Sequence, residues 1–282
     1  MPDLELAKEK FERGRNCALK INFLRHAHKA QFDPHVGGKI SQSGLSEKGK
    51  LASRELGNNI PSENVSEIHS SEFDRNKETA EGITYGSFER EKKTQIMTTR
   101  VKGILNAPHF SSDFIKKEYN PRFNPKPENY DSLDPDEQEK VVEEIEEPAV
   151  EYWLSLWDKK YDYETESAEE VAQRVAYYLT EEAKSINEML SGTEDELIAI
   201  NHKTVTEPIL LACLKPPIKN LNEIGGSLFL LEGWSIDIKT DPEGKKTYKV
   251  SARNKEYELD WKKVEELANF YREKQKKKQE KG

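Results

Sequence analysis

The sequence predicts an α/β protein with a largely parallel sheet, and two segments carry most of that prediction. Residues 19–24 (LKINFL) are short, apolar at alternate positions and compatible with a strand. Residues 196–201 (ELIAIN) are apolar almost throughout, as expected of a central strand that is buried on both faces. Amphipathic segments follow both strands, and this alternation is typical of a parallel sheet covered by helices.

Capping residues and hydrophobic periodicity predict the other elements. A helix is expected over residues 46–57, with Ser46 as its N-cap and Leu51, Ala52 and Leu56 on its inward face. A strand ending near residue 68 and a helix beginning near residue 74 repeat the pattern. Further helices are predicted at residues 3–15, 137–157 (with a break near Pro148), 171–190, 204–214 and from 258 onward. Further strands are predicted at residues 95–99, 226–232 and 248–252. The last two strands are expected to pair through a turn at residues 241–244.

The domain organisation follows from length and from one irregular segment. Residues 103–136 are rich in proline, asparagine and aspartate, which indicates a loop or lid. We expect a single domain over residues 1–282, with a lid or insert region at about 84–160 and a C-terminal helical tail at about 256–282.

Charge and cysteine content exclude several classes of protein. The chain has 53 acidic and 44 basic residues and a net charge of -9, so a general nucleic-acid coat is not expected and any anion site must be built locally. Its 2 cysteines have no CxxC spacing, which argues against a disulfide framework and a cysteine zinc site. No signal peptide or run of ~18 apolar residues is visible. We therefore expect a cytoplasmic protein that binds neither nucleic acid nor a membrane.

Unusual polar residues occur where three predicted strands end. Arg25 and His26 follow the strand at residues 19–24, Arg75 lies just inside the helix after the second strand, and His202 follows residues 196–201. Because ligands of open α/β sheets bind beyond the carboxyl ends of the strands, we expect these side chains to converge. Two arginines and two histidines make a cationic site suited to a phosphate or a phosphate ester.

Phosphoryl transfer is the chemistry that these residue types indicate. A neutral imidazole with a pKa near ~6.5 is a nucleophile at cytoplasmic pH and, once phosphorylated, a good leaving group. Arginines and a second imidazole can orient the phosphoryl group and compensate the charge on its oxygens. No carboxylate cluster or His-x3-His spacing indicates a metal, so neither a metal nor a cofactor is expected.

Five segments resemble, in the same order, motifs of the histidine phosphatase superfamily, which is also called phosphoglycerate mutase-like. They are RHA at residues 25–27 (for the family's Arg-His-Gly), LSEKG at 45–49, SSEFDRNKETA at 70–80, ESAEEVAQRV at 166–175 and IAINH at 198–202. The resemblance covers residues 19 to about 235. It implies a three-layer α/β sandwich with a mainly parallel central sheet.

The resemblance also implies roles for individual residues. His26 would be the nucleophile that becomes phosphohistidine, while Arg25, Arg75 and His202 would bind the phosphoryl group and stabilise its transition state. Ser70 and Ser71 would shape the loop beside Arg75. The residues expected to bind substrate are Arg25, Arg75, His202, Ser71, His28 and Lys203.

Three positions depart from the pattern of the family, and one of them is Lys203, which replaces the common glycine after the second histidine. Ala27 stands where glycine is usual, which is tolerable where the backbone has a negative φ. The family's proton donor is a carboxylate, and our alignment places Gly103 at its position. Asp113 and Glu118 are the candidates for the general acid, because a lid could carry either of them into the pocket.

The leading interpretation is a metal-independent phosphomonoester hydrolase, a histidine acid phosphatase-like enzyme, acting on a small phosphorylated substrate through His26. Two alternatives stay open. One is a phosphoglycerate mutase-type phosphotransferase, although residues 84–136 do not show a mutase-like segment. The other is a non-catalytic phospholigand-binding protein of the same fold, which Ala27 and the missing acid would suit; it could bind inorganic phosphate. Both a monomer and a homodimer are compatible with the sequence.

Overall fold

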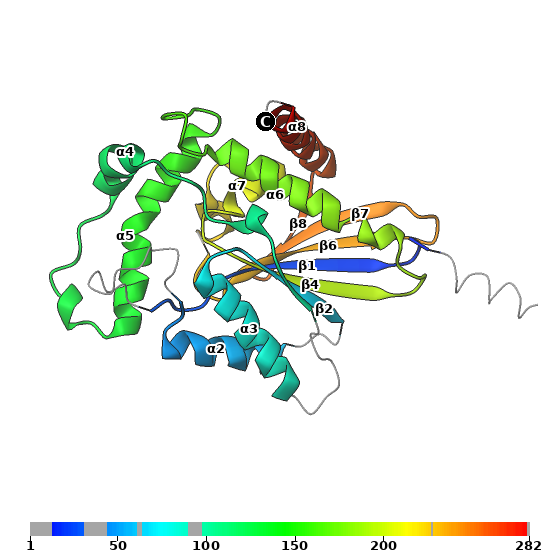
Figure 1. Ribbon diagram of the computed structural model, residues 1–282, viewed down its shortest axis with the longest axis horizontal. Coiled ribbons are helices and arrows are strands. Elements are labelled where there is room, and N and C mark those ends of the chain that lie inside the picture. Colours follow the sequence, from blue (N-terminus) through cyan, green and yellow to red (C-terminus); the bar gives the residue numbers. More distant parts are fainter. Residues whose placement is uncertain (1–12, 31–43, 61–63, 90–97, 227, 281–282) are drawn as a thin grey trace, which may run out of the picture.

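The structure, a computed structural model, describes residues 13–30, 44–60, 64–89, 98–226 and 228–280, and within them it contains one eight-stranded sheet (Figure 1). The strands are β1 (Ala18–Arg25), β2 (Val65–Ser70), β3 (Thr98–Val101), β4 (Glu194–Asn201), β5 (Leu214–Lys215), β6 (Gly233–Thr240), β7 (Lys246–Ala252) and β8 (Lys255–Leu259). Their order is β3-β2-β4-β1-β6-β7-β8-β5. The first four run parallel, and the others extend the sheet in antiparallel pairs. The predicted α/β class with a parallel core is confirmed.

Helices cover both faces of this sheet, which gives three layers. α2 and α3 lie on one face, and α6 and α8 lie on the other (Figure 1). The α-helices are α2 (Glu47–Asn59), α3 (Asp74–Glu89), α4 (Ser112–Phe114), α5 (Pro135–Leu156), α6 (Ala168–Glu182), α7 (Glu207–Cys213) and α8 (Trp261–Gln279). Single 3-10 or π turns lie at Gly103–Leu105, Ile115–Tyr119, Asn120–Arg122, Tyr130–Ser132, Ser185–Asn187 and Leu221–Ile224.

Two apolar cores hold the helices against the sheet. The larger includes Phe23 and the inner faces of α6 and α8, and the smaller includes Ile83 of α3. β4 contributes to both, because Ala199 belongs to the larger core and Ile200 to the smaller. This confirms that residues 196–201 form a central strand buried on both faces.

The inward face of α2 differs in part from the predicted one: Ala52 and Leu56 are half-buried, and Leu56 packs against the smaller core, as predicted. Ser46 does cap the helix, since its hydroxyl accepts a hydrogen bond from the Gly49 amide at 3.1 Å. Leu51, however, is 66% exposed, and the buried residues are Gly49, Ser53 and Gly57. A Cβ at Gly57 would meet the backbone carbonyl of Ile83. The two helices therefore pack through small residues that let their backbones approach, and hydrophobic periodicity does not report such a face.

The predicted strand at residues 226–232 is wrong: the strand begins at Gly233. Leu231 adopts a left-handed φ of 56°, which an extended strand cannot include. The turn at residues 241–244 does join two strands, β6 and β7, because the Gly244 amide donates to the Asp241 carbonyl at 2.9 Å. Residues 248–252 lie in β7, as predicted.

Three predicted helices also differ in their extent. α5 continues through Pro148, because the buried Ile145 before the proline and the buried Ala149 and Val150 after it anchor the helix on both sides of the missing amide. α6 ends at Glu182, and the buried Ile186 lies in a separate 3-10 turn. Of the helix predicted at residues 3–15, residues 3–12 lie outside the described residues, and 13–15 are not helical.

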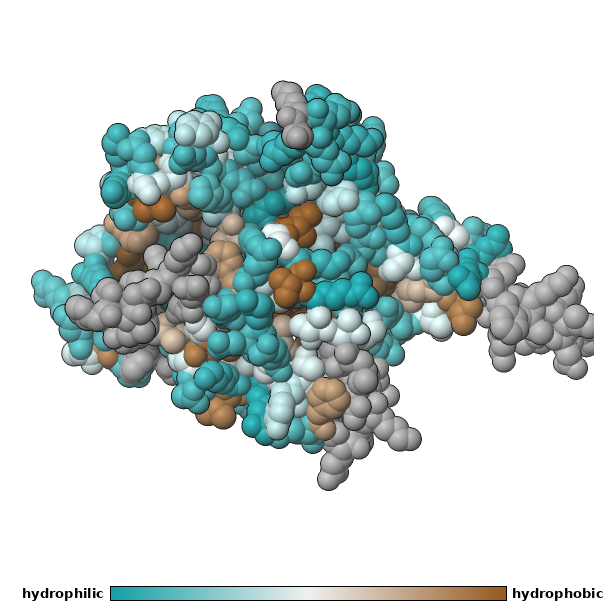
Figure 2. All heavy atoms as spheres, in the orientation of Figure 1, coloured by the Kyte–Doolittle hydropathy of each residue, from teal (hydrophilic) through white to brown (hydrophobic). Residues whose placement is uncertain are grey.

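The segment between β3 and α6 forms a lobe beyond the carboxyl ends of the parallel strands (Figure 1). It contains short turns and the 22-residue helix α5. The visible face of the molecule is mostly hydrophilic, with hydrophobic residues in scattered spots (Figure 2). Among the helices that the structure describes, none is long and apolar enough to cross a bilayer. Cys17 and Cys213 are both buried free thiols.

The contact between α2 and α3 makes a testable prediction. Gly57→Ala should lower the free energy of unfolding by about 1–3 kcal/mol through overpacking, although alanine has the higher helix propensity. Leu51→Ala, on the exposed side of the same helix, should change it by less than about 0.5 kcal/mol. Urea denaturation of both variants measures this; a costly Leu51→Ala beside a neutral Gly57→Ala would restore the face predicted from the sequence.

Candidate active site

The carboxyl ends of β1 and β4 and the start of α3 bring four side chains together. Arg25 ends β1 and His26 follows it, His202 follows β4, and Arg75 is the second residue of α3. The ring centres of the two histidines lie 5.2 Å apart. Because β1 and β4 are parallel neighbours in register, with Arg25 paired to Asn201, the residues after them meet at one edge of the sheet.

Arg75 bridges the two imidazoles. Its Nε donates to Nε2 of His26 at 3.1 Å, and its Nη2 donates to Nδ1 of His202 at 3.2 Å. An arginine only donates hydrogen bonds, so both ring nitrogens must be acceptors. The proton of His26 is therefore on Nδ1, which donates to the Ala27 carbonyl at 2.8 Å. The proton of His202 is on Nε2, 3.3 Å from the hydroxyl of Ser71.

Both histidines are held neutral. Burial, followed by the charges of Arg25 and Arg75, lowers the pKa of His26 well below its usual value. Burial, followed by His26 and the two arginines, lowers the pKa of His202 in the same way. Burial and then Arg25 lower the pKa of Arg75 to about 10, so that it stays a cation at neutral pH. The site thus combines two neutral imidazoles with two guanidinium groups.

The backbone around His26 fixes the surrounding groups. Arg25 is 6% exposed and donates from Nη1 to the Leu228 carbonyl at 2.9 Å. Ala27 is fully buried, and its amide donates to the hydroxyl of Thr79 at 3.1 Å. Its φ is not positive, so the methyl group that replaces the family's glycine is accommodated without backbone strain.

A cavity of about 360 Å³ opens onto these groups. Arg25, His26, Arg75, His202 and Lys203 line its polar side. The lobe closes the opposite side with apolar and aromatic residues, chiefly Phe110, Ile115, Tyr119 and Phe123. A cationic floor facing apolar walls suits an ester that carries a phosphate on one end.

Neither carboxylate predicted as the general acid reaches this cavity. Asp113 pairs with Lys117 at 2.9 Å, and its pKa is lowered by hydrogen bonds from Lys117 and Tyr161. Glu118 pairs with Arg122 at 3.0 Å and accepts from the hydroxyl of Tyr152 at 3.0 Å. Both carboxylates are paired with other side chains of the lobe and do not line the cavity.

Among the residues that the structure describes, the carboxylate that lines the cavity is Glu146 of α5. It accepts a hydrogen bond from the Tyr119 hydroxyl at 2.9 Å. The sequence gives no signal for this residue, since it lies in an acidic run (EEIEE) from residue 143 to residue 147, and only the placement of α5 against the sheet selects one member.

The remaining predicted residues occupy different places. His28 lies outside the cavity, with Nδ1 2.7 Å from the hydroxyl of Ser46, the N-cap of α2. Ser71 is buried behind His202, which it contacts directly. Lys203 is only 6% exposed, lines the cavity, and pairs with Glu147 of α5 at 3.0 Å. Within the described residues, no group of three or more His, Cys, Asp or Glu side chains is arranged to hold a metal ion.

Known structures resemble this chain although no sequence match is found. No sequence-family model matches it, and neither does any curated protein. Mycobacterial glucosyl-3-phosphoglycerate phosphatase has a TM-score of 0.52 at 17% identity, over 84% of this chain and 99% of that one. A structure of that phosphatase with inorganic phosphate has a TM-score of 0.52 at 16% identity, over 84% and 97% of the two chains.

A second kind of enzyme is similar over more of the chain. Phosphoglycerate mutase from Bacillus anthracis has a TM-score of 0.50 at 12% identity, over 90% of this chain and 98% of the mutase. A phosphatase and a mutase thus share one architecture with this protein. These similarities show that the chain has the fold of the histidine phosphatase superfamily, as its sequence motifs predict.

Proposed function

We propose that the protein is a phosphomonoester hydrolase that works through a phosphohistidine on His26, without a metal ion. The observation that carries the proposal is the hydrogen-bonding state of His26. Its Nδ1 proton is held by the Ala27 carbonyl, so Nε2 carries a lone pair inside a cluster that also holds two guanidinium groups. A nucleophilic nitrogen beside fixed cations suits attack on a phosphoryl group.

The contacts suggest how the groups act in sequence. A bound phosphate ester would replace the two imidazoles as the acceptor for Arg75, and Arg25 and His202 line the same cavity. Nε2 of His26 forms a bond to phosphorus as the ester oxygen leaves. Water then attacks phosphorus and breaks the P–N bond, which returns His26 and releases phosphate.

We assign the proton transfer to Glu146. The departing alkoxide needs a proton, and the later attack of water needs a base, so one carboxyl group can serve both steps. Glu146 lines the same cavity as Arg25, His26, Arg75 and His202, and Tyr119 holds it in place. In this proposal the lobe between β3 and α6, which lies within the insert region expected at about 84–160, acts as a lid that brings the acid to the phosphate.

The comparisons support a small phosphorylated substrate but leave two reactions to separate. A similar phosphatase binds inorganic phosphate, and the similarity to a mutase extends over 90% of this chain. In a mutase the phosphoryl group returns to a second hydroxyl of the same molecule instead of passing to water. Exchange of phosphoglycerate isomers without net release of phosphate would identify that alternative.

His26→Ala should abolish phosphatase activity because it removes the nucleophile. We expect aryl-phosphate turnover in chelator to fall by about 10³-fold or more, and the acid-labile phosphoenzyme that is trapped in the wild type to disappear. His109→Ala, which replaces an exposed histidine, is the matched control and should keep both. Equal, slow turnover by wild type and His26→Ala, with no trapped phosphoenzyme, would favour a binding protein instead.

Glu146→Gln should slow alkyl phosphates far more than aryl phosphates, because an acidic phenol leaves without a proton donor. The expected loss of kcat is about 10²–10⁴-fold for an alkyl ester and at most a few-fold for a nitrophenyl ester. Glu118→Gln and Asp113→Asn are the matched variants and should show no such split. Equal losses for both esters in Glu146→Gln would remove the acid role.

Stability should fall in acid because the folded state keeps His202 neutral. The pKa of His202 is lower in the folded chain than in the unfolded chain, so the unfolded state binds more protons as the pH drops below about 6.5. Between pH 7 and pH 5 this effect costs about 2 kcal/mol per buried histidine. His202→Asn should therefore lose about 1–2 kcal/mol less over that range in urea titrations, whereas the exposed His109→Asn should behave like the wild type.

A further inference from the structure

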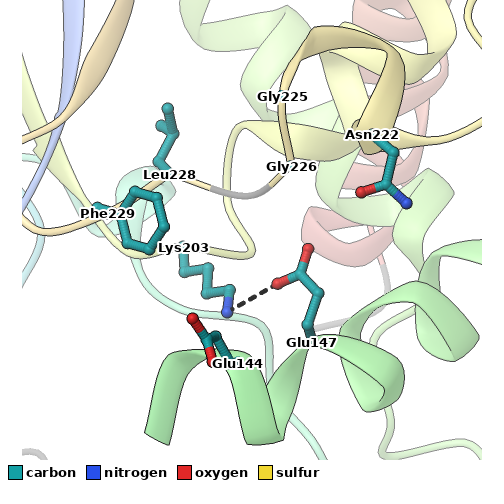
Figure 3. A pocket seen from close by; sticks show the side chains of 8 residues that line it. All are labelled: Glu144, Glu147, Lys203, Asn222, Gly225, Gly226, Leu228 and Phe229. Atoms are coloured by element: carbon teal, nitrogen blue, oxygen red, sulfur yellow. Dashed lines mark ion pairs between the residues drawn. The ribbon is translucent and has the colours of Figure 1, made fainter. Parts of the chain in front are cut away.

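A second cavity of about 290 Å³ lies beside the candidate active site. Its polar walls are Glu144 and Glu147 of α5, Lys203, and Asn222 of the turn at Leu221–Ile224, and its apolar wall is Leu228 and Phe229 (Figure 3). Figure 3 shows the two glutamates approaching Lys203 from one helix, with Asn222 across the opening. None of these groups except Lys203 lines the active-site cavity.

The two cavities are neighbours along a common wall. Lys203 lines both, and consecutive residues of α5 divide between them, Glu146 facing the phosphate site and Glu147 the second cavity. Leu228, which lines the second cavity, accepts the hydrogen bond from Arg25 of the first. A group esterified to a phosphate on His26 therefore has the second cavity within its reach.

The polar walls offer both acceptors and a donor. Lys203 donates to Glu147 at 3.0 Å, and Asn222 donates to Glu151 at 3.0 Å, which fixes both side chains. Glu144 and Glu147 lie three residues apart, so they share a face of α5. Lys203 is the one cation among the described lining residues and faces two carboxylates, so the cavity is net negative and disfavours a second anion.

Hydroxyl groups satisfy such a wall better than a charged ligand does. A hydroxyl both donates and accepts, so it can use carboxylates, an amide and an ammonium group together. A cationic ligand would instead meet the buried Lys203 at the centre of the wall. The exposed ring of Phe229, at 49% exposure, gives a flat apolar face for the C–H groups between hydroxyls.

Gly226 lines the second cavity and places no side chain in it. Its φ of 87° favours glycine, and an added Cβ would meet no atom within 4 Å, which leaves open space next to Asn222 and Leu228. The cavity is thus bounded by backbone on one side and by polar groups on the other.

We propose that this second cavity binds the polyhydroxylated alcohol part of the substrate, so that the protein acts on phosphate monoesters of sugars or sugar alcohols. The proposal rests on the proposed phosphatase function for its phosphate end. It assigns specificity to Glu144, Glu147 and Phe229, with Lys203 shared between the two ends of the substrate.

Binding of two probes of equal length tests the proposal apart from catalysis. Sorbitol phosphate and hexyl phosphate differ only in the hydroxyl groups along the chain, and titration calorimetry on His26→Ala measures both without turnover. We expect sorbitol phosphate to bind at least about tenfold more tightly than hexyl phosphate. Adding Glu144→Ala or Phe229→Ala should reduce that ratio about tenfold. Glu55→Ala, on the exposed side of α2, removes a carboxylate outside both cavities and should leave the ratio unchanged.

The outcomes separate the subsite from the reaction. Equal binding of the two probes, tighter binding of hexyl phosphate, or a ratio insensitive to Glu144→Ala and Phe229→Ala would overturn the subsite, even if aryl phosphates are hydrolysed normally. A tenfold preference that both variants remove would support the subsite, even if the wild type releases no phosphate and the hydrolase proposal fails.

Discussion

The site depends on one guanidinium held between two neutral imidazoles. Arg75 donates to His26 on one side and to His202 on the other, and burial with the nearby arginines keeps both rings unprotonated. A protonated His26 would have no lone pair on Nε2, so the same burial that costs stability in acid keeps the lone pair that the proposed nucleophile needs. An anion is the ligand that this cluster favours, because it compensates the two guanidinium charges and offers each of them an acceptor.

The sheet supplies the backbone that makes this burial tolerable. Parallel β1 and β4 place the residues after them at one edge, and the antiparallel extension brings in the chain before β6. Arg25 makes three hydrogen bonds with that chain: its side chain donates to the Leu228 carbonyl, its amide donates to the Glu232 carbonyl at 3.0 Å, and its carbonyl accepts from the Leu231 amide at 3.2 Å. Leu231, whose left-handed φ is incompatible with the strand predicted at residues 226–232, lies in this same segment before β6.

The lobe between β3 and α6 decides what the anion site can do. From α5, Glu146 reaches the phosphate cavity, and Glu144 and Glu147 reach the neighbouring one. Both cavities meet at Lys203, which is held by Glu147. In the two proposals, a single helix outside the sheet would therefore connect proton transfer with recognition of the alcohol.

The sequence by itself determined the α/β class, the central strand and the grouping of Arg25, His26, Arg75 and His202. These depend on local patterns, and the carboxyl ends of parallel neighbours must meet at one edge. Only the tertiary structure decided which carboxylate enters the cavity and which face of α2 is buried. The position of α5 relative to the sheet depends on long-range packing, which an acidic run does not encode. α2 packs through Gly49 and Gly57, where the lack of a side chain lets the neighbouring backbone approach closely. Asp113, Glu118 and His28 have suitable chemistry, but neighbouring side chains in the fold hold them elsewhere.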